Sequence, residues 1–377
     1  MTTSTSETTV VFEAGTIADA MKKAGSVAPA KAGAAFDSAA GIVMDVLPGT
    51  ETPCVIRATD TDIYFIETLD VVKAEGNPVR WRLPSQLLAN VVGSQASGSG
   101  KTITFKQLSS SQIQVSSASM RSKINLNGNP NYPSWSPLSG INYSTAPGFG
   151  DAVSRVMWAA EKGGVPLLSG FHLNGTHVVT TDRYRVARFP MEIDIKEPIT
   201  IPAGKVGSLL RGTGDILVGT HDDLFVMMPD DYTEIRTTVY GGQYPSIDKI
   251  FGLPYTESVT FQKQELIERV QRANHFAGTD RAPVLYLYLG RDQIAVMMEN
   301  REVGQYGDVI DVPGQAQHTR VLLRFSPSMI LDSLSNAPNP AVTLSYNPDA
   351  TNRPVKIEGG LGYECWLAPR SEITPTS

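Results

Sequence analysis

The feature that most constrains this 377-residue chain is an internal repeat with a period of roughly 120 residues. Residues 58–71, 179–190 and 298–312 resemble one another: each is an apolar strand that ends at Asp or Asn and leads into a second strand. We align Asp62, Asp182 and Asn300 as equivalent positions. A period of this length predicts repeated structural units rather than one large core.

A second set of equivalent segments follows these strands. Residues 81–92, 200–210 and 323–334 each combine a strand, a helix-starting residue (Pro84, Pro202 or Ser326) and a short amphipathic helix. A longer helix opens each repeat, over residues 16–27, 149–162 and 263–276, with apolar side chains on one face. Alternation with period two predicts strands over residues 102–106, 112–116, 177–181, 215–219, 284–289 and 341–345.

These patterns together predict an α+β fold of three similar domains, in which two helices pack on antiparallel sheets. We expect a disordered tail over residues 1–9, domains over 10–137, 138–254 and 255–371, and a second tail over 372–377.

The composition excludes several classes of protein. Cys54 and Cys365 are the only cysteines, which is too few for a disulfide framework or a cysteine-rich zinc site. No apolar run of about 18 residues predicts a membrane span, and the Ser/Thr-rich start lacks the apolar core of a signal peptide. We therefore expect a cytoplasmic protein.

The net charge is −6, so the chain is no simple basic DNA-coating protein, although a local basic surface remains possible on an acidic chain. Cations do gather on the outward faces of the predicted helices, and Trp158 and His275 accompany them. The candidates are Lys22, Lys23, Arg155, Lys162, Lys205, Arg211, Arg269 and Arg272. The alternative is a set of ordinary solvated helix faces, because Asp151, Glu265 and Glu268 lie there too.

No motif nominates a catalytic or metal-binding residue. Residues 98–102 resemble the end of a phosphate-binding loop, but the required Gly five residues before Gly100 is Gln95, and a strand follows where a helix is needed. The five histidines form no pair with zinc-ligand spacing. We expect no cofactor and no enzymatic activity.

The order and spacing of the three repeats resemble the bacterial β sliding clamp, the processivity factor of the replicative DNA polymerase. The resemblance runs from about residue 10 to residue 370. It is clearest at residues 168–170 with 181–187, at 241–251 and at 309–312.

The resemblance implies a head-to-tail homodimeric ring that encloses double-stranded DNA without reading its sequence. The helices would line the hole, so the cations named above become the expected DNA-lining residues, and Lys31 is a further candidate. Such a ring does no chemistry; it tethers a polymerase and slides.

The resemblance also implies a pocket for short apolar peptides of the polymerase and the clamp loader. By position it would include Leu168, Thr181, Arg183, Tyr184, Arg185, Val186, Pro245, Lys249, Ile250, Trp366, Leu367, Ala368, Pro369 and Arg370. The chain departs from the family here, since Tyr184 replaces the usual His and Arg183 replaces a small residue. The usual Met-Pro-Met-Arg ending is replaced by residues 366–370, so partner preference is expected to differ.

The ring is expected to close through residues 120–126, with Ile124 and Leu126 as apolar contacts and Phe276 opposite them. Two other functions stay open at the level of sequence. One is a β-rich structural or assembly protein, which would not bind DNA. The other is a hydrolase on a β-rich scaffold, which would need a nucleophile and a base that the sequence does not reveal.

Overall fold

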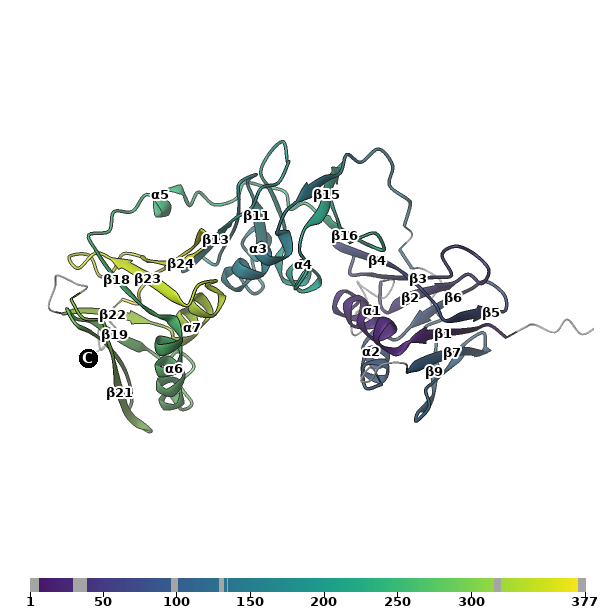
Figure 1. Cartoon of the computed structure of the whole chain (residues 1–377), viewed down its shortest axis with the longest axis horizontal. Helices are drawn as coiled ribbons and strands as arrows, with labels where there is room; N and C mark the ends of the chain where they lie inside the picture. The colour runs from purple at the N-terminus through teal and green to yellow at the C-terminus, as the bar shows by residue number, and fades with distance from the viewer. Residues whose placement is uncertain are drawn as a thin grey trace, which may run out of the picture. The chain divides into compact units, whose positions relative to one another are not determined.

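The computed structural model describes residues 7–29, 39–95, 101–128, 132–133, 135–314 and 320–371. The chain forms two compact units, coloured along the chain in Figure 1. Unit 1 consists of Met1–Ala146 and Ser208–Val239, and unit 2 of Pro147–Gly207 and Tyr240–Ser377. The division into three domains stays a prediction.

Unit 1 contains two antiparallel sheets. The order in the five-stranded sheet is β5 (Lys73–Glu75), β1 (Thr9–Glu13), β7 (Thr102–Ser109), β8 (Gln112–Ser116) and β9 (Arg121–Asn125). The eight-stranded sheet has the order β10 (Ser144–Ala146), β15 (Ile216–His221), β16 (Leu224–Asp230), β17 (Thr233–Thr238), β4 (Ile63–Leu69), β3 (Cys54–Thr59), β2 (Ile42–Val46) and β6 (Val79–Leu83). Strand β9 is therefore an edge strand.

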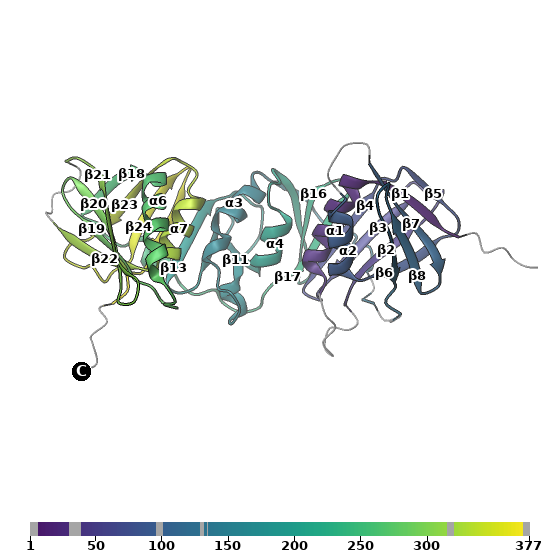
Figure 2. The same cartoon turned by 90° about the horizontal axis from the view of Figure 1, so that it is seen from below.

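Helices α1 (Ala14–Val27) and α2 (Ser85–Gly93) lie side by side in unit 1 (Figure 2). Helix α1 contacts β3 and β4 of the larger sheet and β1 and β7 of the smaller one. Its buried face, which includes Ile17, Met21 and Ala24, follows the helical period. This helix therefore joins the cores of both sheets.

Unit 2 repeats this plan. Its eight-stranded sheet has the order β14 (Ile199–Pro202), β11 (Gly170–Leu173), β12 (His177–Thr181), β13 (Arg185–Pro190), β25 (Tyr363–Leu367), β24 (Val355–Gly360), β23 (Ala341–Tyr346) and β18 (Glu257–Gln262). The four-stranded sheet has the order β21 (Gly304–Asp311), β20 (Gln293–Asn300), β19 (Leu285–Leu289) and β22 (Val321–Phe325).

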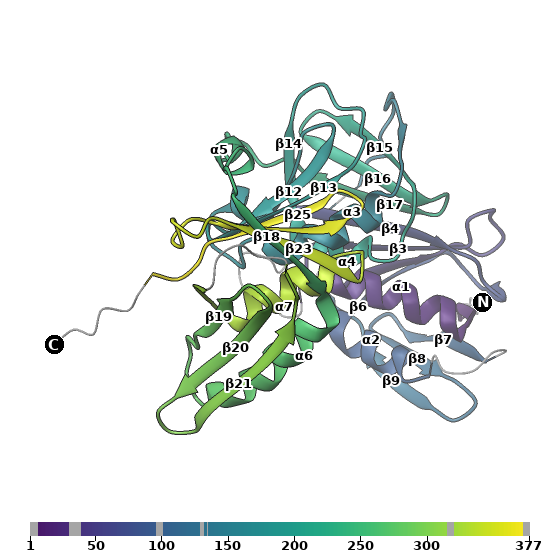
Figure 3. The same ribbon diagram turned by 60° about the vertical axis from the view of Figure 1, so that its left-hand side comes forward.

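Figure 3 shows α6 (Lys263–Asn274) beside α7 (Pro327–Asn336), and α6 also contacts β20 and β21. Helix α3 (Phe149–Val156) contacts β12, β13 and α7, and the short α5 (Asp248–Phe251) precedes β18. The boundary between the units passes through α4 (Ala203–Leu209). Helices packed on antiparallel sheets confirm the predicted α+β class.

The predicted repeat appears as a recurring turn. Thr59 Oγ1 donates to the Ile63 carbonyl oxygen at 2.8 Å, and Thr181 Oγ1 donates to that of Arg185 at 2.7 Å. Thr61 and Arg183 occupy the same left-handed position, with φ of 84° and 77°. Each turn has the same hydroxyl-to-carbonyl hydrogen bond and a positive φ at the same position, so the two turns are built alike.

Side-chain oxygens also accept backbone N–H groups in the same way in all three turns. Asp60 accepts from Asp62 and Ile63, Asp182 from Tyr184 and Arg185, and Asn300 from Glu302 and Val303. The residue equivalent to Asp182 is therefore Asp60. The alignment of Asp62 with Asp182 was wrong by two residues, because Asp62 donates its N–H in this turn instead of accepting.

Helix boundaries differ from the prediction at one important place. The α-helix expected over residues 149–162 ends at Val156 and continues as a single 3-10 turn, η1 (Met157–Ala159). Ala160 is already extended, with ψ of 145°. Lys162 therefore lies outside the helix, and Trp158 is buried, where the sequence placed it on the outward face.

Residues 8 and 9, which the sequence assigned to a disordered tail, belong to the fold. Thr8 is buried and donates a hydrogen bond to the Asn77 carbonyl oxygen, and β1 begins at Thr9. Residues 1–6, the tail 372–377, Lys31 and residues 98–100 lie outside the described residues. The six strand predictions agree with β7, β8, β12, β15, β19 and β23.

Candidate functional site

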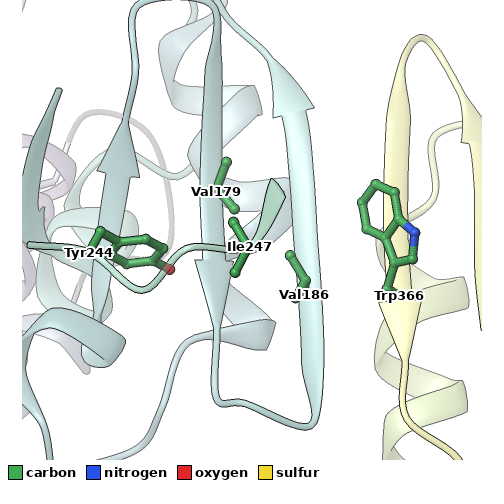
Figure 4. Packing of buried hydrophobic residues seen from close by; sticks show 5 residues of the cluster. All are labelled: Val179, Val186, Tyr244, Ile247 and Trp366. Atoms are coloured by element: carbon green, nitrogen blue, oxygen red, sulfur yellow. The ribbon is translucent and has the colours of Figure 1, made fainter. Parts of the chain in front are cut away.

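An apolar cluster covers one face of the larger sheet of unit 2. Five buried side chains form its centre, and four half-buried ones pack around them. The centre consists of Val179, Val186, Tyr244, Ile247 and Trp366, and the surrounding residues are Leu167, Ile250, Phe251 and Tyr255. Figure 4 shows Ile247 lying over the strands that carry Val179 and Val186, with Trp366 on a neighbouring strand. We call these nine residues the apolar cluster.

Residues 240–255 supply most of the cluster without belonging to the sheet. The segment begins where the Tyr240 N–H donates to the Thr200 carbonyl oxygen at 2.8 Å. It then makes a turn of helix, in which the Ile250 N–H donates to the Ile247 carbonyl oxygen at 2.9 Å. A segment outside the sheet thus forms part of the apolar surface.

Two cations flank Trp366. Its ring centroid lies 4.8 Å from that of Phe251, and the guanidinium of Arg188 stands over both rings, at 5.2 and 4.3 Å. The ammonium of Lys356 lies 5.8 Å from the Trp366 ring. Arg188 and Lys356 both bind Glu364 on β25, and Lys356 also binds Glu358, so two carboxylates meet the two cations at the border of the cluster.

Tyr244 closes one side of the cluster by stacking on a histidine. The rings of His172 and Tyr244 lie 4.2 Å apart and are tilted by only 7°. Burial lowers the pKa of His172, because the charged imidazolium is poorly solvated there. The stacked pair therefore covers this side of the cluster.

The structure brings only some of the predicted pocket residues to this cluster. Val186, Ile250 and Trp366 belong to it. Tyr184 is 70% exposed, and its carbonyl oxygen accepts the Ala368 N–H at 2.8 Å. Pro245 and Lys249 are exposed, while Pro369 and Arg370 are half-buried. Thr181 is buried and holds the turn described above, with Arg183 exposed at its tip.

Three predicted pocket residues lie elsewhere. Arg185 binds Asp332 of α7 at 3.0 Å and stands over the Trp158 ring, on the helix side of the sheet. Leu367 is opposite Arg185 in the strand register and is fully buried. Side chains alternate along a strand, so both face away from Val186 and Trp366. The cluster contains Leu167 and not the predicted Leu168.

Most of the cluster was missed at the level of sequence. The missed residues are Leu167, Val179, Tyr244, Ile247, Phe251 and Tyr255. Three of them lie within residues 241–251, which the resemblance had singled out as a segment. The four large apolar side chains of that segment were the signal that could have nominated them.

The predicted DNA-lining cations fall into two groups. In the first group, acidic side chains or backbone carbonyls already engage the cation. Lys23 binds Asp19 and Glu67, Arg155 binds Asp151, Arg269 binds Asp308, and Arg272 binds Glu268 and Asp308. Burial works to lower the pKa of Lys23, but its two carboxylate partners raise it above the usual value.

The second group consists of the other four cations, which differ in exposure and in position. Lys22 is exposed on α1, Lys205 is half-buried on α4, and Arg211 is exposed in the turn that follows α4. Lys162 is exposed but lies in the bend after η1. Seven of the eight cations therefore lie on a helix or within two residues of its end, and Lys162 does not.

The predicted dimer contacts are placed differently from the expectation. Ile124 is only 3% exposed, so its own unit already covers it, and Leu126 lines a cavity of unit 1. The exposed side chains of edge strand β9 are Arg121, Lys123 and Asn125. Phe276 is half-buried and its ring lies 5.6 Å from that of Tyr306 on edge strand β21.

No group of three or more His, Cys, Asp or Glu side chains that could hold a metal ion occurs among the described residues. Cys54 and Cys365 are both buried, and burial raises the pKa of each thiol to about 12. In the part of the chain that the structure describes, no helix is both long and apolar enough to span a bilayer.

Comparison with known proteins gives one consistent answer. No family model matches the chain. The β sliding clamp of Streptococcus pneumoniae is 21% identical over 267 residues, which cover 65% of this chain and 68% of that protein.

The similarity to solved structures is more extensive. The DNA polymerase III β subunit of Thermotoga maritima superposes with a TM-score of 0.80 at 17% identity, over 97% of this chain and 100% of that one. That of Borrelia burgdorferi gives 0.79 at 15% identity, over 97% and 98%. The sliding clamp of Bacillus subtilis gives 0.78 at 15% identity, over 98% and 100%. The chain therefore has the fold of the bacterial β sliding clamps, at low sequence identity to each of them.

Proposed function

We propose that the protein is a DNA sliding clamp, which encircles double-stranded DNA and tethers the replicative polymerase during processive synthesis. The observation that carries the proposal is the length of the fold similarity, which spans 97% of the chain and all of the Thermotoga β subunit. The protein would act on DNA in the cytoplasm, without a cofactor and without catalysis.

The cations on the helices would meet the DNA backbone. Phosphate contacts position a duplex without reading its sequence, and several weak contacts suffice for a ring that is held by its topology. The ion pair of Arg272 with Asp308 does not oppose this role, because the Arg272 side chain is mostly exposed. Exposed ion pairs contribute about 0–1 kcal/mol each, so a phosphate can replace the carboxylate.

The apolar cluster would receive the peptide of the polymerase or of the clamp loader. Half-buried Ile250 packs against the buried centre of the cluster, and exposed Tyr184 lies two residues before the cluster residue Val186. An apolar side chain that fills such a surface can dominate the binding energy of a short peptide. The charged border formed by Arg188, Lys356 and Glu364 would bind polar flanking residues.

Two copies would close the ring head to tail, with β9 of one copy beside β21 of the other. Both are edge strands, whose outer N–H and C=O groups need a partner. The strands also differ in charge: β9 carries Arg121 and Lys123, while β21 carries Asp308 and Asp311. Opposite charges on the two edges favour this pairing over pairing of like edges.

Reversing the charge of β9 is expected to produce folded monomers. In Arg121→Glu with Lys123→Glu, both edges would be acidic, and like charges across an interface weaken it strongly. Light scattering on wild-type protein should give twice 40.7 kDa, and on the variant a single chain mass. Lys73→Glu, an exposed cation on β5, is the matched control and should remain a dimer. If the double variant stayed dimeric and its dimer dissociated no more readily than that of wild type, the interface would lie elsewhere.

A closed clamp is expected to stay on circular DNA and to leave linear DNA. Protein loaded onto a nicked plasmid should co-elute with it at a salt concentration that screens phosphate contacts, because the ring is then held by topology alone. Cutting the plasmid once should release the protein, whatever the sequence at the cut ends. Equal retention on circular and linear DNA would contradict the clamp. Absence of any DNA association would favour the structural or assembly protein.

A further inference from the structure

Unit 1 contains a second feature that the clamp function does not use. It is a cavity of about 460 Å³ on the outward face of strands β2, β3 and β6. Arg57, Arg80 and Arg82 line it, together with Ser110 and Ser111 from the β7–β8 turn. Cavities that bind small ligands have volumes of about 300–1,000 Å³, so the size alone permits an organic ligand.

The strand register puts the three arginines on one face. Val43 of β2 lies opposite Arg57 of β3 and opposite Arg82 of β6, so these three residues form a row across the sheet. Asp45, two residues further along β2, lies opposite Arg80. Side chains two residues apart on a strand share a face, so Asp45 and Arg80 lie on the same face of the sheet as this row.

Positive charge exceeds negative charge at this face. Asp45 binds both Arg57 and Arg80, the latter through Nε at 2.6 Å and Nη2 at 3.1 Å. Arg82 instead directs its Nε to the Ala40 carbonyl oxygen at 2.8 Å. Asp45 does not line the cavity, and the described lining residues include no carboxylate. Burial, and next to it the charge of Arg80, lowers the pKa of Arg57, as expected where cations crowd together.

Donors remain available for a ligand. Among its described contacts, Arg57 uses only Nη1 and Arg80 leaves Nη1 unused. A guanidinium offers five N–H donors in a planar fork, which matches the oxygens of a phosphate. The side chain of Arg80 is 69% exposed, so its Nη1 donors can reach a ligand that enters from solvent.

An aromatic wall stands beside the arginines. Tyr132 and Trp135 line the cavity, with ring centroids 5.8 Å apart, and Arg82 stands over the Tyr132 ring at 5.1 Å. The indole Nε1 of Trp135 is buried and has no hydrogen-bond partner in the described part of the chain. A buried donor without a partner is costly, and a ligand oxygen would satisfy it.

We propose that this cavity binds a nucleoside monophosphate, with the phosphate on Arg57 and Arg80 and the base against Tyr132 and Trp135. Inorganic phosphate would occupy only the arginine side of the cavity. The site would therefore bind the nucleotide more tightly than phosphate alone. The proposal is independent of the ring, because every residue involved belongs to unit 1.

Isothermal titration of the full-length protein with dAMP, and separately with inorganic phosphate, tests the site. Wild-type protein should bind both ligands, dAMP more tightly. Arg80→Gln should weaken both by about tenfold, the loss expected for one charged hydrogen-bonding fork. Trp135→Leu should weaken dAMP several-fold and leave phosphate unchanged. Lys73→Gln, which removes an exposed cation of the same unit, is the control and should bind like wild type.

Each other outcome overturns the proposal. Equal affinity for dAMP and phosphate would mean that the aromatic wall binds no base. Equal binding by wild type and Arg80→Gln, with Arg57→Gln also unchanged, would mean that the arginines only support the sheet. If wild-type protein bound neither dAMP nor phosphate, the arginines would likewise only support the sheet. Circular dichroism of each variant checks that the fold is retained. Retention of the protein on circular DNA, which tests the clamp, does not depend on the outcome of this titration.

Discussion

Replacing Trp366 with alanine is expected to lower the free energy of unfolding of unit 2 by about 3–5 kcal/mol. The side chain is 1% exposed and packs against Val179, Val186 and Ile247. Removing the indole would leave a cavity beneath Ile247, because a segment tied at both ends cannot collapse fully into the space. It would also remove the ring that Arg188 and Phe251 cover.

Urea denaturation followed by circular dichroism measures this loss. Trp366→Phe keeps an aromatic ring in the cluster and should lose less than half as much stability. Tyr232→Ala in unit 1 removes a side chain that is 60% exposed and should change stability by about 0.5 kcal/mol or less. A Trp366→Ala protein as stable as wild type would show that the cluster is not a packed core.

Replacing Tyr184 and Ile250 together with alanine is expected to weaken partner-peptide binding by about 2 kcal/mol or more, which is about 30-fold. Tyr184 is mostly exposed and Ile250 half-buried, so both can be removed at small cost to the fold. The ring should stay closed, since neither residue lies on β9 or β21.

Fluorescence anisotropy with a labelled apolar peptide from the polymerase of the same organism measures the change. Leu217→Ala, in unit 1, removes another partly exposed apolar side chain and serves as the control. Light scattering on the double variant separates loss of the peptide site from loss of the dimer. Unchanged affinity in the double variant would move the peptide site away from the apolar cluster.

Some elements of the fold were predictable because their signals are local. The buried residues Leu266, Ile267, Val270 and Ala273 of α6 follow the helical period, as the sequence indicated. Strands β8 and β12 have the predicted bounds, since alternation with period two is a property of adjacent residues. Helices α2 and α7 begin directly after Pro84 and Ser326, because a helix-starting residue acts on the residues next to it in the chain.

Other features depend on contacts that a local pattern does not record. Helix α3 ends at Val156 although the apolar period continues to Ala160, because Trp158 turns inward and donates to the Arg155 carbonyl oxygen at 3.0 Å. Likewise, Asp60 and Asp62 are both acidic residues near the same turn. Only the backbone hydrogen bonds reveal that Asp60 accepts and is the equivalent of Asp182.

The repeat, the α+β class and the concentration of cations on helices could be predicted, because each is a pattern along the chain. Which side chains meet depends on the tertiary structure. Ile247 reaches Trp366 across 119 positions of sequence, and Arg57, Arg80 and Arg82 meet through strand register. It also decided that Ile124 is buried and Arg121 exposed. Such outcomes follow from strand pairing between distant segments, which periodicity along one segment does not specify.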